Sequence, residues 1–138
     1  MLFKPRDVLD ENLDNQRVFV PFAARNKGKV ISVRDLRPGT VIKDEAIPTV
    51  LCQHRGSTFV TSNVTDFWRK VGAHRRYCIV CLPLLIERQH EIPELLAALL
   101  RHREFRTVKQ RMGKVIRANW SEIILYQVGC RTATKCPW

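Results

Sequence analysis

Lysine and arginine in the second half of the sequence are the residue types best suited to do chemistry, and that chemistry is phosphate binding. Residues 1–50 hold nine basic and seven acidic residues, whereas residues 51–138 hold fifteen and six. Arginine outnumbers lysine sixteen to eight, and its planar guanidinium makes bidentate contacts to phosphate and stacks on bases. A net charge of +11 produces repulsion between the side chains of a compact chain. Such an excess of positive charge usually serves to bind a polyanion. The composition predicts nucleic-acid binding, with RNA as the preferred target; a solvated basic surface and an acidic protein partner are the alternatives.

Two clusters of cations are the candidate RNA-binding residues. In residues 104–118 the apolar side chains share one helical face, which predicts a helix that docks on a sheet and turns its cations toward backbone phosphates. In residues 54–77 cations alternate with the aromatic side chains of Phe59, Trp68 and Tyr77, which could stack on unpaired bases. An ordinary amphipathic helix and buried aromatic side chains are the plainer interpretations. The predicted contacts are Arg55, Lys70, Arg75, Arg76, Arg106, Arg111, Lys114 and Arg117.

A zinc site has to be weighed as well. Its possible ligands are Cys52, His54, Cys78 and Cys81. The Cys-x-x-Cys spacing suits zinc, but Ile79 and Val80 favour an extended strand, which points the two sulfurs to opposite faces. Five scattered cysteines, an odd number, also argue against a disulfide framework and for reduced thiols in an intracellular compartment. The sequence therefore predicts buried structural cysteines, no metal and no cofactor.

The usual catalytic motifs are absent from the sequence. It contains no G-x-G-x-x-G or G-x-x-x-x-G-K loop, no G-x-S-x-G turn and no H-E-x-x-H pair. Solubility and helix-dipole roles suffice for carboxylates such as Asp44, Glu45 and Glu94. The sequence predicts a protein that is not an enzyme and has no small-molecule substrate.

The elements that must position these side chains form one α+β domain, since 138 residues suit a single core. We expect an extended N-terminal arm over 1–16 and one domain over 17–138, with a β-rich part at 17–82, a helical part at 92–118 and a closing strand and tail at 121–138. The architecture is a small twisted or barrel-like β-sheet followed by C-terminal helices and a closing strand. Strands are predicted at 17–22, 29–33, 41–42, 47–52, 57–61, 78–82 and 122–127, the sixth at the sheet centre.

Helices are predicted from their start signals and periodicity. Asn63 or Thr65 would cap a short helical stretch at 65–71. Pro93 introduces a helix over 94–100 with its leucines on one face. A bend at 101–103 separates it from the basic helix at 104–118.

The N-terminal residues carry the acids Asp7, Asp10, Glu11 and Asp14. Secretory signals need an apolar core and organellar transit peptides are poor in acids, so neither is predicted. The longest apolar run, 78–86, is too short to span a bilayer. No membrane partner is expected.

Three consecutive segments carry a resemblance to a known family. They are a turn at Gly39-Thr40-Val41-Ile42, a strand around Val50–Phe59 and a basic loop at 70–76. In type and near-order the matching residues are Gln53, Arg55, Gly56, Phe59, Asn63 and Val64. Over residues 38–82 the chain thereby resembles the bacterial-type large-subunit ribosomal protein family numbered twenty-seven. The resemblance implies an RNA-binding structural component of a mitochondrial ribosome, in contact with ribosomal RNA and neighbouring ribosomal proteins. The expected location is mitochondrial, otherwise cytoplasmic.

Residues 28–47 also look like the strand–turn–strand that opens β-clip domains, as in the SAF and SET families. A SET methyltransferase needs an Asn-His pair, which this sequence lacks, so the segment supports a hairpin more than an activity. Two alternatives stand beside the ribosomal one: a non-catalytic protein-interaction subunit of another large complex, and a β-clip or zinc-binding module.

Overall fold

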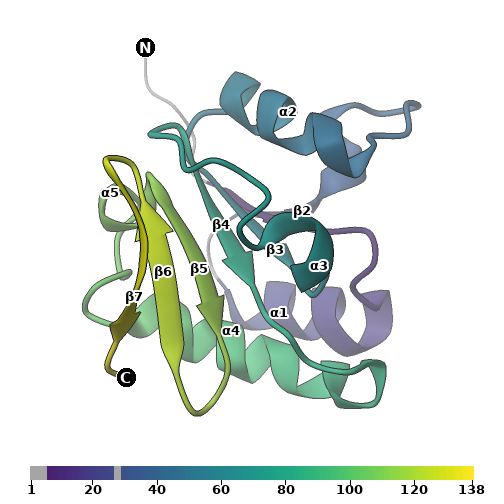
Figure 1. The fold of residues 1–138 in the computed structure, drawn as a ribbon. Helices are drawn as coiled ribbons and strands as arrows, with labels where there is room; N and C mark the ends of the chain where they lie inside the picture. Colours follow the sequence, from purple (N-terminus) through teal and green to yellow (C-terminus); the bar gives the residue numbers. More distant parts are fainter. Residues whose placement is uncertain (1–5, 27–28) are drawn as a thin grey trace.

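The computed structural model describes residues 6–26 and 29–138, which form a seven-stranded sheet with helices on both faces (Figure 1). The strands are β1 (Arg6–Leu9), β2 (Lys29–Ser32), β3 (Ser57–Thr61), β4 (Tyr77–Cys81), β5 (Lys114–Ala118), β6 (Ile123–Gln127) and β7 (Cys130–Cys136). The α-helices are α1 (Val20–Arg25), α2 (Ile47–Gln53), α3 (Val64–Phe67), α4 (Ile92–Arg101) and α5 (Val108–Arg111). Shorter helical turns are η1 (Asn15–Phe19), η2 (Val33–Leu36), η3 (Asp44–Ala46) and η4 (Ile86–Glu91). The predicted mixture of helices and strands is confirmed.

The sheet is mostly parallel, and its strand order is β2-β1-β3-β4-β5-β6-β7. Strands β1 to β5 pair in parallel, and β6 and β7 continue the sheet in antiparallel. After β1 the chain moves outward to β2 and then returns past β1 to β3. The order therefore reverses between β1 and β3, and in open parallel sheets ligands bind beyond the carboxyl ends of the strands at such a point.

Two hydrophobic cores hold the layers together, one on each face of the sheet. On one face Phe22 of α1 and Leu95 of α4 pack against Val60 and Val80. On the other face Leu51 of α2 and Phe67 of α3 lie in one cluster with Phe59 and Ile79. Strands β3 and β4 are buried along their whole length because helices cover both their faces. Figure 1 shows α1 and α4 on the side of the sheet opposite α2 and α3.

The central strand is the one that the sequence predicted. β4 is the fourth of seven strands, and Cys78 and Cys81 belong to the cores on its opposite faces. Burial raises the pKa of both thiols to about 12. The sulfurs therefore cannot share one ion, as the strand alternation predicted.

The strands predicted at 17–22 and 47–52 are wrong, because both segments are helical. Pro21 and Pro48 lie in the first turns of α1 and α2. Proline is tolerated there because the backbone N–H that it lacks would have no hydrogen-bond partner within the helix. Short apolar runs fit either a strand or one side of a helix, so the residues alone did not decide. The strand predicted at 41–42 is also absent: those two residues lie in an irregular segment before η3.

The predicted N-terminal arm 1–16 is not a single extended segment: residues 6–9 form strand β1, a turn follows, and η1 begins at Asn15. β1 lies between β2 and β3, and its Val8 and Leu9 are buried. Residues 1–5 of the predicted arm lie outside the described residues. Four residues with two apolar side chains give too short a pattern for a strand to be recognised from sequence.

The helix predicted at 94–100 is confirmed as α4, whereas the basic helix at 104–118 is wrong. That segment forms α5, a break at Gly113 and strand β5. Gly113 has φ +89°, a backbone region that a continuing helix does not visit. The strands at 29–33, 57–61 and 122–127 match β2, β3 and β6, and the stretch at 65–71 shortens to α3, which Asn63 caps. No helix in the described part is long and apolar enough to cross a membrane.

Candidate nucleic-acid interface

Parallel pairing brings cations that are far apart in the sequence together along the side of the sheet where strands β1 to β4 begin. These cations stand at or just before the first residues of β1 to β4, and we call the set the amino edge: Arg6, Lys29, Arg55, Arg75 and Arg76. The register aligns the starts, because Arg6 pairs with both Lys29 and Ser57, and Ser57 pairs with Tyr77. Neighbouring strands are about 4.8 Å apart, so four of them spread this charge over roughly 15 Å.

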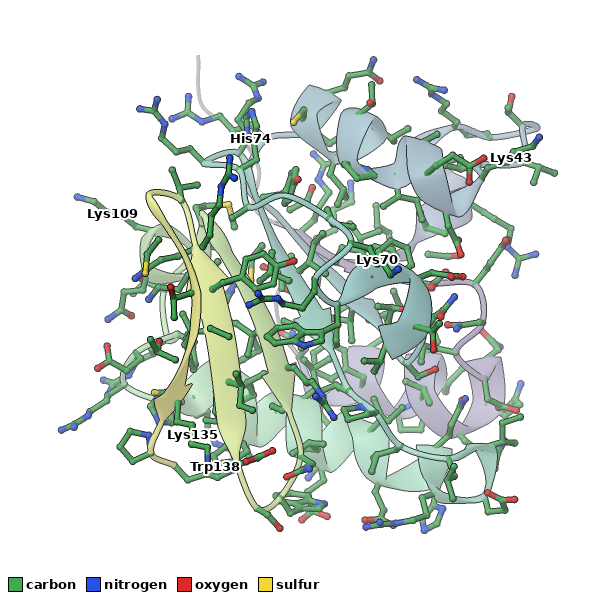
Figure 2. All side chains as sticks on the ribbon, viewed as in Figure 1. Lys43, Lys70, His74, Lys109, Lys135 and Trp138 are labelled. Carbon is green, nitrogen blue, oxygen red and sulfur yellow. The ribbon has the colours of Figure 1, made fainter. Side chains whose placement is uncertain are left out.

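The loop before β4 presents the densest part of the amino edge. Arg55, Arg75 and Arg76 are exposed, and no ion pair in the described part of the chain involves Arg75 or Arg76. Arg76 Nε donates to the Cys52 carbonyl at 2.7 Å, which fixes its guanidinium. The His74 ring stacks on Tyr77 at 5.6 Å, and Figure 2 shows nitrogen-tipped side chains around His74. Arg75 and Arg76 thus present their charge at this edge without an ion pair to a described carboxylate.

Of the eight predicted RNA contacts, the structure brings three to the amino edge: Arg55, Arg75 and Arg76. Lys70 lies elsewhere, in a hollow that it shares with the acids Asp44 and Asp66. Arg106 borders a cavity whose wall also includes Arg6 and Lys29. The predicted set is therefore not one surface.

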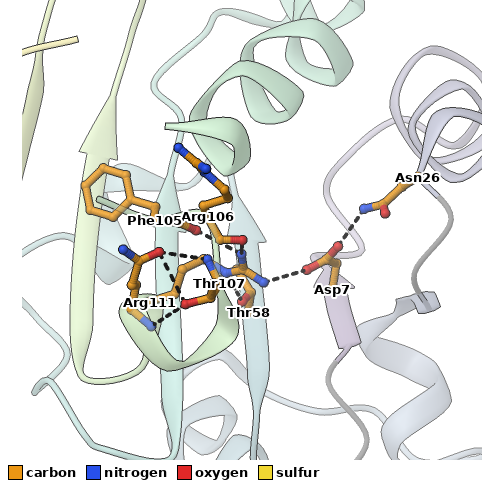
Figure 3. A network of polar contacts seen from close by, with 8 residues as sticks. Asp7, Asn26, Thr58, Phe105, Arg106, Thr107 and Arg111 are labelled. Carbon is orange, nitrogen blue, oxygen red and sulfur yellow. Dashed lines mark hydrogen bonds and ion pairs between the residues drawn. The ribbon is translucent and has the colours of Figure 1, made fainter. Parts of the chain in front are cut away.

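Arg111 is buried, which corrects its prediction as an outward-facing cation. Its side chain donates from Nε to Thr58 Oγ1 at 3.1 Å and from Nη1 to the Phe105 carbonyl at 2.9 Å (Figure 3). Its Nη2 lies 4.0 Å from Asp7 Oδ1, and Asn26 donates to the other carboxylate oxygen of Asp7 at 2.7 Å. Burial raises the pKa of Asp7 although the nearby Arg111 charge lowers it. Arg111 holds the sheet to the segment before β5 and is not available to a phosphate.

Lys114 and Arg117 do not share a face either. Both lie on β5, where residues three apart point to opposite sides of the sheet. The Lys114 ammonium sits over the Phe105 ring at 5.2 Å. The predicted row of four cations depended on a helix that does not exist.

The aromatic side chains predicted as base-stacking platforms are mostly interior. Phe59 and Tyr77 are buried, and Trp68 packs on Tyr126 with ring centroids 5.2 Å apart. Binding at the amino edge would therefore depend on phosphate contacts and not on these rings.

A group of carboxylates lies at the opposite ends of the parallel strands, at the switch point between β1 and β3. Its Asp44 was expected to serve only solubility or a helix dipole, and its Asp10 and Asp66 were assigned no functional site. Asp10 directly follows β1 and accepts a hydrogen bond from the Thr61 hydroxyl, at the end of β3, at 2.7 Å. Asn63 donates from its side-chain amide to Asp44 at 3.3 Å and to Asp66 at 2.8 Å. We call these residues the carboxyl-edge group. The signal that could have found Asp10 is its position immediately after a buried strand.

The ionised forms of the Asp10 and Asp44 carboxyls are disfavoured in this group. Burial raises the pKa of Asp10, and the Asp44 charge raises it further. Burial, a hydrogen bond to Asp66 and the charge of Asp66 raise the pKa of Asp44. In the described residues no set of three or more His, Cys, Asp or Glu is arranged to hold a metal ion. Carboxylates held together against their repulsion are typical of functional sites.

Replacing Asp10 by asparagine should stabilise the protein at neutral pH. Because the folded pKa is raised, the contribution of Asp10 to stability is full below about pH 4 and is lost as the pH rises through the raised pKa. Asparagine keeps an acceptor for Thr61 and carries no charge. We expect Asp10→Asn to raise the free energy of unfolding at pH 7 on the order of 1 kcal/mol, with no gain at pH 3.

Urea unfolding at both pH values measures this effect. Glu87→Gln, which removes an equal charge at an exposed position, is the control and should change little at either pH. A variant Asp10→Asn less stable than the parent at pH 7 would contradict the interpretation of this group.

Comparison of the chain with family models, curated proteins and solved structures finds no match.

Proposed function

We propose that this protein binds RNA through its amino edge. The observation that carries the proposal is the alignment of four parallel strand starts, which gathers Arg6, Lys29, Arg55, Arg75 and Arg76 along one edge of the sheet. Such a row suits the repeated charges of a nucleic-acid backbone. The net charge of +11 supports the same conclusion.

RNA affinity should fall steeply with salt. If about five cations neutralise phosphates of a single strand, the logarithm of the association constant falls with the logarithm of salt with a slope of roughly −3.5. Between 50 and 200 mM salt we expect about a 100-fold loss of affinity. Fluorescence anisotropy with a labelled RNA measures the slope, and a slope near zero would contradict phosphate binding.

The ribosomal assignment stays a prediction that depends on the resemblance of residues 38–82. It implies association with ribosomal RNA and ribosomal proteins, and a mitochondrial location. Sedimentation of the native protein at low salt tests it: co-sedimentation with ribosomal particles supports the assignment. A defined protein partner that survives nuclease would instead favour the interaction-subunit alternative. In the structure Val50–Gln53 belong to α2, whereas the resemblance implies a strand there.

A second candidate function is metal-assisted cleavage of the bound RNA, and the position of the carboxyl-edge group favours it. The group lies at the switch point, where ligands of parallel sheets bind. Mg²⁺ binds through one or two carboxylates and keeps several waters, so Asp44 and Asp66 could hold it without a third acid. A Mg²⁺ ion held there would supply Lewis-acid stabilisation of a phosphodiester and would make a water easier to deprotonate. In the net hydrolysis the hydroxyl of one water would join phosphorus, the bond from phosphorus to the ribose oxygen would break, and the water's remaining proton would balance the one taken up by that oxygen. Lys70 lines the same hollow and could contact the phosphate.

Incubation of a labelled RNA with the full chain and Mg²⁺ tests this second function. Cleavage that requires Mg²⁺ and is lost in Asp44→Asn and Asp66→Asn supports it. These variants leave the amino edge intact, so their RNA affinity should not fall. Uncleaved RNA that is nevertheless bound would leave RNA binding as the function and remove the catalytic one.

A further inference from the structure

A cavity of about 390 Å³ opens beside the starts of β1 and β2, next to the C-terminal ends of α1 and α4. Its size falls in the range of ligand pockets, roughly 300–1,000 Å³. Six cations line it: Arg6, Arg25, Lys29, Arg101, Arg106 and Arg111. Asp7 is the one carboxylate in the described lining.

The carboxylate is already occupied. Asp7 faces Arg111 at 4.0 Å and accepts from Asn26, so this pair forms a nearly neutral part of the wall. No ion pair of the described residues involves Arg25, Lys29, Arg101 or Arg106. These four cations thus bring positive charge to the cavity without an ion pair to a described carboxylate.

Favourable interaction with helix dipoles explains the positions of only some of these cations. Arg25 and Arg101 stand in the last turns of α1 and α4, where cations are favoured. Lys29 begins a strand and Arg106 lies in the segment before α5, so neither gains from a helix end. Gathering both beside Arg25 and Arg101 costs repulsion, which an anion in the cavity would relieve.

Part of the lining is apolar. Phe22, Ala97 and Leu100 border the cavity. Phe22 belongs to the core between α1, α4 and the sheet, and Leu100 is half-buried against that core. Because α1 and α4 contact each other and residues of both helices line the cavity, we infer that it suits a terminal group more than a chain passing through. A ligand with an anionic end and a flat or apolar body would contact both the cationic and the apolar parts of the lining.

We propose that this cavity binds a phosphate monoester, with the phosphate among Lys29, Arg101 and Arg106 and the attached group against Ala97 and Leu100. A monoester carries close to two negative charges at neutral pH, and arginine meets its oxygens with paired donors. The monoester is either the 5′-terminal phosphate of an RNA or a free mononucleotide. The former deepens the proposed RNA binding, with which the cavity shares Arg6 and Lys29; the latter is independent of it.

Calorimetric titration of the full chain with AMP, adenosine and inorganic phosphate tests the cavity. We expect AMP to bind at least ten-fold more tightly than adenosine, and inorganic phosphate to compete with it. The double variant Arg101→Gln/Arg106→Gln should weaken AMP at least ten-fold. The control Arg103→Gln/Lys109→Gln removes two exposed cations of the same segment that do not line the cavity, and it should bind AMP as the parent does. Equal binding of AMP and adenosine, or equal losses in the two double variants, would overturn the proposal.

Two short RNAs that differ only in a 5′-phosphate or 5′-hydroxyl distinguish the sources of the monoester. Tighter binding of the phosphorylated RNA, lost in Arg101→Gln/Arg106→Gln, supports the RNA terminus. AMP binding with no effect of the 5′-phosphate supports the free nucleotide. AMP binding without any RNA binding would retain the cavity and refute the amino-edge function, whereas RNA binding without AMP or 5′-phosphate recognition would refute the cavity alone.

Discussion

Replacing Arg111 by methionine should lower the free energy of unfolding by about 3–5 kcal/mol, the cost of breaking a buried ion pair from one side. Arg111 is 7% exposed, and its removal leaves the Asp7 carboxylate buried without its cation. It also leaves Thr58 and the Phe105 carbonyl without their donor. Methionine retains much of the side-chain length, so the loss reports the lost charge and hydrogen bonds more than a cavity. Denaturant unfolding at pH 7 measures it.

A matched control lies two residues away. Lys109 is exposed on the same short helix, and Lys109→Met should change stability by less than about 0.5 kcal/mol. Adding Asp7→Asn to Arg111→Met removes the stranded charge and should recover at least half of the loss. A loss below about 1 kcal/mol for Arg111→Met would show that the pair does not hold the sheet to the segment before β5.

Arg111 also shows why the basic helix was mispredicted. The apolar residues of 104–118 satisfy helical spacing, yet Val115, Ile116 and Ala118 are packed on the two faces of a strand. The pattern of apolar residues fits both a helix and a strand, because the segment is buried on more than one side. Periodicity distinguishes a helix from a strand only when one side of the element faces water. Gly113 was the local signal for a break. Once the helix is divided there, four cations that seemed to share a face point in different directions.

The elements that sequence did predict are those decided locally. Pro93 at the start of α4 and leucines at helical spacing specify that helix, and the valine, isoleucine and cysteine run of β4 specifies the most buried strand. The arrangement of strands depends instead on pairing between distant segments. Residues 6, 29, 55 and 75 share an edge only because β1 to β4 run in parallel, and Asp10 meets Thr61 for the same reason. No local pattern contains that information, so the sequence supplied the excess of charge without its location.

Neutralising three cations of the amino edge should remove most RNA binding. In Arg55→Gln/Arg75→Gln/Arg76→Gln each glutamine keeps a polar side chain but loses its phosphate charge. We expect RNA affinity at 50 mM salt to fall on the order of 100-fold or more, and the salt slope to become shallower by about 2, since each single-strand phosphate contact contributes roughly 0.7. Fluorescence anisotropy across a salt series measures both quantities, and the far-ultraviolet spectrum checks that the variant is folded.

The control has to separate this edge from the net charge, because any loss of three cations weakens long-range attraction. Arg17, Arg34 and Arg88 serve, since each forms an ion pair with an acid of the chain and none lies at the amino edge. The variant Arg17→Gln/Arg34→Gln/Arg88→Gln carries the same net charge as the edge variant, and we expect its affinity to fall by less than about ten-fold with the slope unchanged. Equal losses in the two variants would mean that RNA responds to the total charge of the molecule, and the amino edge would then be no more than one part of a basic surface. A loss confined to the edge variant would instead identify the row of strand starts as the surface that meets the RNA backbone.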